Sequence, residues 1–155
     1  MSKWHKFWQL STAERTTFVQ ALLILPAVAL GLRGLGLRRL QALLAGLSRL
    51  DDIQPLEHPA PQAQQAQGLA RMVRAAAANG PYRATCLPQS LTVWWLLRRG
   101  GIAGQLRLGV RKEANCFEAH AWVEVEGLVL NDQQDVPQRY PPFTQTGPPQ
   151  KASLP

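Results

Sequence analysis

The sequence predicts an α+β fold, in which N-terminal helices precede one central helix that packs on an antiparallel sheet. Three observations predict it. Between residues 32 and 50, leucines recur at three- and four-residue steps, the spacing of a helix buried on one side. Residues 116–126 alternate between apolar and polar side chains, as a half-buried strand does. Residues 86–99 carry Pro88 in what would be a first helical turn and stop before Gly100, as a helix does.

Two helices are expected in the first fifty residues. Ser11 and Glu14 have the spacing of a helix N-cap with a capping box, so the first helix is predicted over residues 12–25. Pro26 is expected to kink or end this helix, because proline removes a backbone hydrogen bond. The second helix is predicted from residue 32 onward, with its leucines in the core and its arginines in solvent.

Residues 16–32 form an apolar run with no charge between Arg15 and Arg33. The run has 17 residues, fewer than the roughly 20 that cross a bilayer, and it contains Pro26. Glu14 and other polar residues separate it from the early lysines, unlike the arrangement in a signal peptide. We interpret it as a buried or surface-docked helix. Peripheral membrane contact is one alternative, and a signal peptide or membrane span is another.

The rest of the chain divides into a linker, a core and a tail. A helix is expected over residues 68–79, because Asn79-Gly80-Pro81 is a helix stop signal. Residues 102–110 and 128–132 are the remaining predicted strands, the latter after a turn at Glu126-Gly127. The proline-rich tail is expected to be extended or disordered. The predicted organisation is 1–50 helical, 51–80 linker and helix, 81–136 core and 137–155 tail.

Composition limits the classes of function. The chain has 155 residues, of which 46% are hydrophobic, and its 17 Lys and Arg against 10 Asp and Glu give a net charge of +7. These values exclude an acidic disordered chain, a multi-domain enzyme, a collagen and a disulfide-dense scaffold. The basic residues are dispersed and accompany no nucleic-acid-binding motif, so no nucleic-acid partner is expected. An acidic peptide or an anionic membrane surface accounts for the charge equally well.

Cys86 is the candidate nucleophile. It lies at the N-terminal edge of the predicted helix, where the helix dipole and unpaired N–H groups favour a thiolate. The same N–H groups would hold the oxyanion of a tetrahedral intermediate. The alternative is a buried, inert cysteine. Cys116 has no helix N-terminus beside it and is expected to be non-catalytic. The two cysteines do not form a CxxC motif, so no metal or cofactor is expected, and a reducing cytoplasmic compartment is the default.

His120 is the candidate general base. It shares the polar face of its predicted strand with Trp122, which is expected to shield it from water. A histidine beside a helix-starting cysteine takes the thiol proton and returns it to the leaving amine. Asp132 is the candidate residue for holding the histidine tautomer, with Asp135 as the fallback. A two-residue turn at Glu126-Gly127 followed by a continuous strand would point Asp132 away from His120. We therefore predict either a bulged turn or a bend just before Asp132.

These residues carry a resemblance to a known family. Residues 86–91 (CLPQSL) and 96–102 (LLRRGGI) resemble the nucleophile helix of transglutaminase-like cysteine proteases. Residues 119–127 (AHAWVEVEG) and 130–132 (LND) resemble their His and Asp strands. With its short Leu- and Arg-rich helical N-terminal part, the chain is similar to the stand-alone leader peptidases of lasso-peptide biosynthesis. The resemblance covers roughly residues 10–132, and AHAWVE is its most specific part.

The resemblance implies a papain/transglutaminase-like core with Cys86, His120 and Asp132 as the catalytic triad. It implies that the substrate is the leader region of a ribosomally made precursor peptide, cut before a separate ATP-dependent lasso cyclase acts. In many members of that family a small winged-helix-like domain, fused or separate, grips the leader, and nothing in residues 1–50 resembles it. A separate leader-recognition protein is therefore expected as partner, with the apolar N-terminal helices as its docking surface.

Other functions stay open beside this one. An acyltransferase would use the same three residues, with an amine in place of water resolving the thioester. A basic adaptor or membrane-peripheral protein would use the Leu- and Arg-rich helices and leave Cys86 merely packed. A nucleic-acid binder would show a steep salt dependence of binding.

Overall fold

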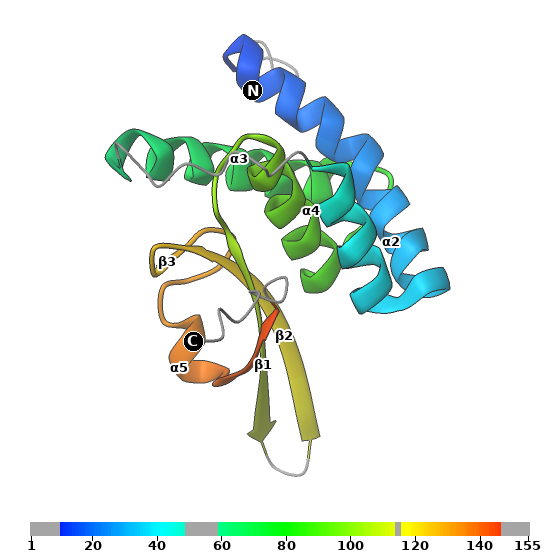
Figure 1. Cartoon of the computed structure of the whole chain (residues 1–155), viewed down its shortest axis with the longest axis vertical. Helices are drawn as coiled ribbons and strands as arrows, with labels where there is room; N and C mark the ends of the chain where they lie inside the picture. Colours follow the sequence, from blue (N-terminus) through cyan, green and yellow to red (C-terminus); the bar gives the residue numbers. More distant parts are fainter. Residues whose placement is uncertain (1–9, 49–58, 114–115, 147–155) are drawn as a thin grey trace, which may run out of the picture.

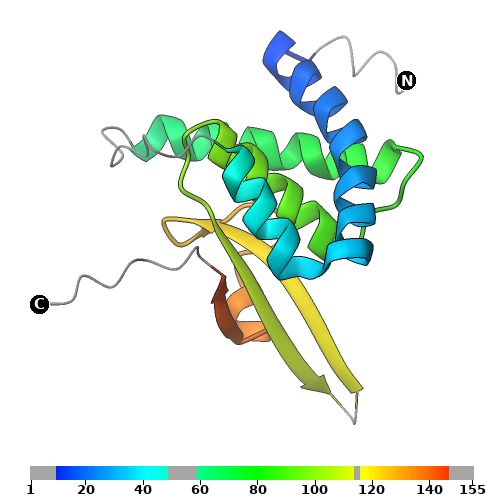
Figure 2. The ribbon, with the colours of Figure 1, turned by 45° about the vertical axis from the view of Figure 1, so that its right-hand side comes forward.

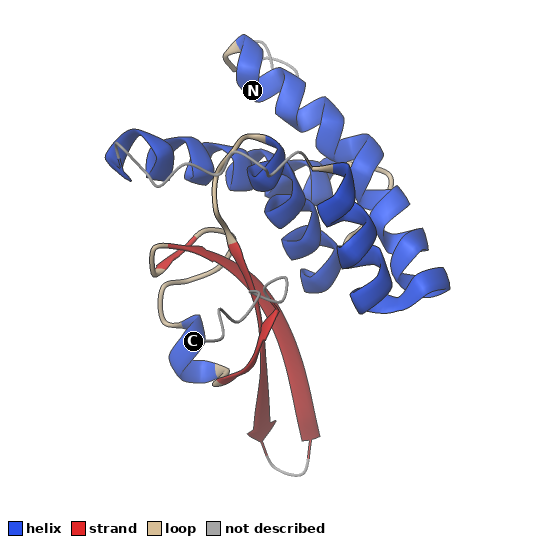
Figure 3. Cartoon of the chain, in the orientation of Figure 1, coloured by secondary structure: helices blue, strands red, loops and turns tan. Residues whose placement is uncertain are grey.

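The computed structural model describes residues 10–48, 59–113 and 116–146. The long helices lie together beside a small antiparallel sheet, as Figures 1 and 3 show. The helices are α2 (Thr12–Leu47), α3 (Pro59–Asn79), α4 (Cys86–Arg99) and the short α5 (Val136–Arg139). The strands are β1 (Gln105–Glu113), β2 (Cys116–Val125), β3 (Leu128–Val129) and β4 (Pro142–Thr146), in the sheet order β3-β2-β1-β4. The predicted α+β class is confirmed.

Helix α2 begins with the predicted capping box. The backbone N–H of Glu14 donates to Ser11 Oγ over 3.2 Å, and the backbone N–H of Ser11 donates to Glu14 Oε2 over 2.9 Å. These two bonds satisfy N–H groups that the first helical turn leaves without a partner. The Ser11 hydrogen bonds lower the pKa of Glu14, so the carboxylate that completes the box is ionised at neutral pH.

The first helix does not end at Pro26, which was one of the two predicted outcomes. Pro26 lies inside α2, and its neighbours Leu25 and Val28 are buried in the core, which offsets the one backbone hydrogen bond that proline removes. The break lies instead at Gly36, where φ is 74° and ψ is 169°. Glycine adopts this conformation without a steric penalty. The chain turns there, and Figure 2 shows the two limbs of α2 on either side of the turn.

Helix α2 has features of both a membrane helix and a core helix. By length and composition it could cross a membrane, and within the described residues it is the one helix that could. It is also a core helix, because Ala21, Leu25 and Val28 are buried. Its outer side keeps large apolar residues in solvent, with Leu23 71% and Leu30 67% exposed. Membrane association and a role in the core are therefore both compatible with this helix.

Helix α3 starts at Pro59, well before the predicted start at residue 68. Its buried side is made mainly of alanines, which let its backbone approach α2 and α4 closely. The central helix α4 contacts α2, α3, β1 and β2. Leu91, Trp94 and Leu97 of α4 are almost completely buried. The buried side chains of α4 pack with buried side chains of α2, α3, β1 and β2 in one cluster, which we call the main core.

Strand β2 separates the main core from a second one. Val123 and Val125 point to the side of α4 and belong to the main core. Trp122 points to the opposite side, where it packs with Val129, Val136 and Tyr140. We call these four residues the small core. The alternation predicted for residues 116–126 is thus confirmed, and its polar face turns out to hold a buried tryptophan.

The segment after residue 136 differs from the expected extended or disordered tail. Residues 136–139 form α5, and β4 pairs with β1, with Leu106 opposite Thr146. Tyr140 between them is buried. Prolines are compatible with this arrangement because Pro142 begins an edge strand and Pro137 lies in a first helical turn. Residues 147–155 of the expected tail lie outside the described residues.

Candidate active site

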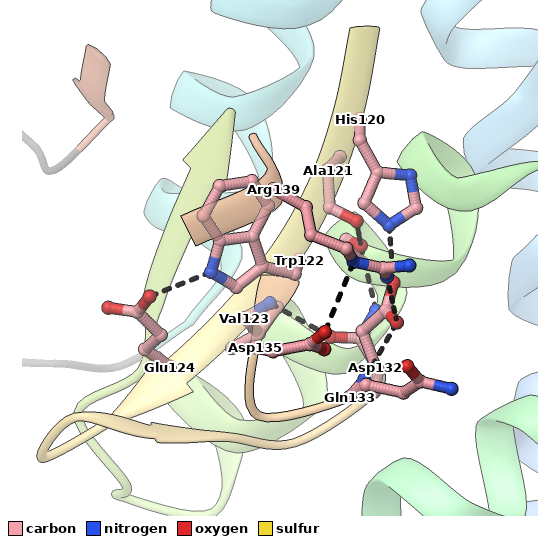
Figure 4. A network of polar contacts seen from close by, with 11 residues as sticks. His120, Ala121, Trp122, Val123, Glu124, Asp132, Gln133, Asp135 and Arg139 are labelled. Atoms are coloured by element: carbon pink, nitrogen blue, oxygen red, sulfur yellow. Dashed lines mark hydrogen bonds and ion pairs between the residues drawn. The ribbon is translucent and has the colours of Figure 1, made fainter. Parts of the chain in front are cut away.

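His120 and Asp132 are hydrogen-bonded to each other through His120 Nε2 and Asp132 Oδ2, as Figure 4 shows. Both side chains are half-buried. The turn between β2 and β3 is the two-residue Glu126-Gly127 turn, with φ of 51° and 80°. Strand β3 then ends at Val129, before the predicted end at residue 132, and the chain bends ahead of Asp132. Of the two predicted arrangements, the structure has the bend rather than the bulged turn.

Two further groups hold the Asp132 carboxylate. The backbone N–H of Gln133 donates to Asp132 Oδ1 over 2.7 Å, and Arg139 Nη2 lies 3.8 Å from the same oxygen. Arg139 also pairs with Asp135 at 3.6 Å. The fallback residue Asp135 thus faces the arginine of α5, and the carboxylate that bonds His120 is Asp132.

Aromatic rings flank the imidazole of His120. The ring centroids of His120 and Trp122 are 6.3 Å apart with an interplanar angle of 21°, and those of His120 and Tyr140 are 4.9 Å apart. Gly109 of β1 lies opposite His120. A side chain at Gly109 would collide with the backbone oxygen of Tyr140, so glycine is what lets Tyr140 come close. These rings form an apolar surface behind the imidazole, which agrees with the expected shielding by Trp122.

Tyr140 is also tied to the surface of the sheet. Its hydroxyl hydrogen-bonds to Glu118, and this bond raises the pKa of Tyr140. Arg111 Nη2 donates to Glu118 Oε2 over 2.7 Å, and this bond is the main reason that the pKa of Glu118 lies below its usual value. The Arg111 guanidinium also lies 5.1 Å from the centroid of the Tyr140 ring. Glu118 therefore lies between Arg111 and the tyrosine that contacts His120.

Cys86 is the first residue of α4 and carries a partly buried free thiol. Within the described part of the chain, the N-cap residue Thr85 makes no capping bond with its side chain. The N–H groups of the first turn are therefore not taken up by that hydroxyl. A helix N-terminus of this kind favours an anion, whether a thiolate or the oxyanion of an acyl intermediate.

Ser90 connects α4 to the neighbours of both His120 and Asp132. Its hydroxyl donates to the carbonyl oxygen of Ala121 over 2.8 Å and accepts from Asn131 Nδ2 over 2.8 Å. Ala121 follows His120 in the chain, and Asn131 precedes Asp132. Ser90 lies four residues after Cys86, so both are on one side of α4. The side of α4 that carries the thiol thus faces the segment that carries the imidazole.

Asn131 completes this connection. Its side-chain oxygen accepts from the backbone N–H of Val123 over 2.8 Å. One amide thereby links β2, α4 and the loop that carries Asp132, which we call the Ser90–Asn131 link. Sequence reasoning did not assign a role to Ser90, Asn131 or Tyr140. The available signals were the four-residue spacing from Cys86 to Ser90 and the position of Asn131 directly before Asp132.

The other candidate residues lie elsewhere. Cys116 is exposed at the start of β2, four residues from His120. In the described ranges, no group of three or more His, Cys, Asp or Glu side chains is placed to hold a metal ion. His5 and His58, expected to be surface residues, lie outside the described residues. The fold therefore pairs an imidazole with a carboxylate, and Ser90 ties their segment to the helix that begins with the thiol of Cys86. A thiol, an imidazole and a carboxylate are the groups that nucleophilic acyl chemistry needs.

Comparison with known proteins supports this interpretation. A family model of the transglutaminase-like superfamily matches residues 28–145, about three quarters of the chain. The match runs from α2 to β4 and so includes Cys86, His120 and Asp132, together with residues 137–145 of the segment expected to be a tail. No curated protein and no solved structure matches the chain.

Proposed function

The chain belongs to the transglutaminase-like superfamily, and from that premise we propose that it is a cysteine peptidase with Cys86 as nucleophile. His120 is the general base in this proposal, and Asp132 is the residue that orients His120. The superfamily has a scaffold of the cysteine protease or acyltransferase type. The observation that carries the proposal is the Ser90–Asn131 link, because it ties the thiol side of α4 to the His120–Asp132 pair.

The proposed reaction follows from these positions. His120 takes the thiol proton of Cys86, and the thiolate attacks the scissile carbonyl carbon. Backbone N–H groups of the first turn of α4 hold the resulting oxyanion. The C–N bond breaks as the imidazolium gives its proton to the leaving amine, which leaves a thioester on Cys86. Water, deprotonated by His120, then hydrolyses the thioester and restores the thiol. Asp132 stabilises the imidazolium in both steps.

We further propose that the substrate is the leader region of a ribosomally made lasso-peptide precursor. The similarity of residues 119–124 (AHAWVE) to the lasso leader peptidases supports this substrate class. The peptidase would act in the cytoplasm with a separate leader-recognition protein and upstream of the lasso cyclase. Five exposed leucines of α2 make this helix the proposed docking surface for the recognition protein: Leu23, Leu30, Leu35, Leu43 and Leu47.

The test is a cleavage assay read by mass spectrometry. The protein is mixed with the precursor peptide encoded nearby and with a candidate leader-recognition protein. The matched variants are Cys86→Ala and Cys116→Ser, which each remove one thiol. Cleavage at a single bond by the wild type and Cys116→Ser, but not by Cys86→Ala, is the expected result. Cleavage by Cys86→Ala would remove Cys86 from the mechanism.

Two other outcomes would change the assignment. A conjugate of leader and amine in place of a free leader would indicate acyl transfer on the same scaffold. No cleavage by any variant, with the recognition protein shown to bind the leader, would favour the non-catalytic adaptor.

A further inference from the structure

Every second residue of β2 directs its backbone N–H and C=O groups away from β1. The carbonyl of Val123 accepts from the backbone N–H of Leu130, and the N–H of Val123 donates to the side chain of Asn131. Both groups therefore point away from β1, toward the β3 side. Because backbone groups alternate in direction along a strand, those of Ala121, Ala119 and Phe117 point the same way. We call this side of β2 the outer edge.

Hydrogen bonds within the protein occupy the backbone groups of only the first part of the outer edge. Strand β3 pairs with β2 only at Glu124 and Val125. The Asn131 side chain then takes the place of a strand at Val123, and the Ser90 hydroxyl does so at the carbonyl of Ala121. Beyond that point, within the described ranges, no strand pairs with the outer edge, and Figures 1 and 2 both draw this part of β2 without a neighbour on that side.

The open part of the outer edge starts at the candidate active site. It comprises the N–H and C=O groups of Ala119 and Phe117, which are exposed residues, whereas Ala121 is buried. His120 lies between Ala119 and Ala121, and its own backbone faces Gly109 of β1. Helix α4 reaches the same edge, because Ser90 bonds the outward carbonyl of Ala121. A chain lying along this edge would therefore pass both His120 and the side of α4 that begins with Cys86.

We propose that the outer edge of β2 from Phe117 to Ala119 binds the substrate as an added strand, an extended peptide held by main-chain hydrogen bonds. This inference rests on the proposed peptidase function and names how the same site holds its substrate. Open strand edges bind extended peptides in this way, and alternate residues of the peptide point their N–H groups at the edge. The side chains of Phe117 and Ala119 are exposed, so they leave room for an approaching chain.

The test uses chloromethyl ketones on Cys116→Ser protein, which removes the exposed second thiol. The Cys86 thiolate displaces chloride from the probe and forms a carbon–sulfur bond, which mass spectrometry maps. Acetyl-Ala-Ala-Ala-chloromethyl ketone carries a peptide backbone, and chloroacetone carries the same reactive group without one. The peptide probe is expected to label Cys86 at least about tenfold faster, because one net hydrogen bond is worth about that much.

N-methylation of the probe supplies the sharper comparison. A methyl group on the N–H that points at the edge is expected to slow labelling by about tenfold, and a methyl group on the adjacent N–H is expected to leave the rate within about twofold. Equal effects at adjacent positions would overturn the inference, as would equal rates for the peptide probe and chloroacetone.

Two outcomes separate this inference from the function on which it rests. If chloroacetone labels Cys86 no faster than it labels N-acetylcysteine, the nucleophile assignment itself fails. If Cys86 is activated but shows no preference for the peptide, only the edge inference fails. A dimer in sedimentation velocity that Ala119→Pro dissociates would also overturn the inference, because a second copy would then cover the edge. Proline is tolerated where a strand N–H faces solvent, so this variant is compatible with the fold.

Discussion

The Ser90 hydroxyl donates to the carbonyl of Ala121 over 2.8 Å, and this single bond joins the helix of the thiol to the strand of the imidazole. Ser90 is fully buried, so the bond is shielded from water. The same oxygen accepts from Asn131, whose neighbour Asp132 bonds His120. A serine that the chemistry itself does not use therefore ties the helix that begins with Cys86 to the neighbours of His120 and Asp132.

Ser90→Ala is expected to lower the free energy of unfolding by about 1–3 kcal/mol, because it leaves buried polar groups of Ala121 and Asn131 without their partner. Urea denaturation followed by tryptophan fluorescence measures this. Thr92→Val is the control, since the Thr92 hydroxyl is also buried in α4 but bonds only the Pro88 carbonyl of its own helix. Equal losses for the two variants would show that the Ser90–Asn131 link adds nothing specific.

Asp132→Asn is expected to lower kcat for leader cleavage by about 100-fold at pH 7, because an amide carries no charge with which to stabilise an imidazolium. Asp135→Asn removes the neighbouring carboxylate, which pairs with Arg139, and is expected to change kcat by less than about threefold. Steady-state cleavage kinetics compare the two. A larger loss for Asp135→Asn would transfer the orienting role to the fallback residue.

Much of this site is visible in the sequence. The alternation along residues 116–126 predicts which side chains share a face with His120, and β2 confirms it. The turn at Glu126-Gly127 restricts Asp132 to two arrangements, one of which occurs. Each inference depends on residues close together in the chain, where backbone geometry limits the outcome.

Other features could not be predicted because distant residues decide them. Asn131 bonds Ser90 across 41 positions of sequence, and no local pattern predicts that contact. Pro26 and Gly36 both disfavour a helix, and core packing around Leu25 and Val28 decides that the chain breaks at the glycine. The prolines after residue 136 suggested an unpaired tail, yet β1 offers an edge with which β4 pairs.

Trp122→Ala is expected to destabilise the protein by about 3–5 kcal/mol, the usual cost of truncating a fully buried tryptophan. Trp122→Phe should lose less, because it keeps a ring beside His120. Phe117→Ala, on the same strand but 74% exposed, should change stability by less than about 0.5 kcal/mol. Thermal unfolding compares the three. A Trp122→Ala variant as stable as the wild type would show that the small core does not hold β2.

Gly109→Ala is expected to destabilise the protein by about 1–3 kcal/mol, because the new methyl group would push the Tyr140 backbone off the sheet. Gly34→Ala is the matched control. It lies in α2, a methyl group there would meet no atom within 4 Å, and alanine favours the helix, so stability should rise by about 0.5–1 kcal/mol. Chemical denaturation of both variants tests the pair, and a neutral Gly109→Ala would contradict the close approach of Tyr140.

Glu118→Gln is expected to lower the pKa of Tyr140 toward its ordinary value, because it removes the carboxylate whose hydrogen bond raises that pKa. The nearby Arg111 charge then favours the phenolate and acts in the same direction. The chain has two tyrosines, so Tyr82→Phe leaves Tyr140 as the sole signal in an absorbance titration at high pH. A pKa that stays or rises in Glu118→Gln would show that the carboxylate does not bond the phenol.

The two faces of β2 carry cores of very different size, so the two sides of the sheet are expected to open at different free energies. The small core holds four buried side chains, and three of them, Val129, Val136 and Tyr140, lie in the part of the chain that also carries Asp132 and Arg139. A unit with so few apolar contacts opens at lower free energy than the whole molecule. Amide hydrogens of α5 and its flanking loop should therefore exchange with solvent sooner than those of α4. Each such opening would release Asp132 from His120 while the helices stay folded, so the fraction of molecules competent for chemistry would be set locally and would fall on warming before global unfolding begins.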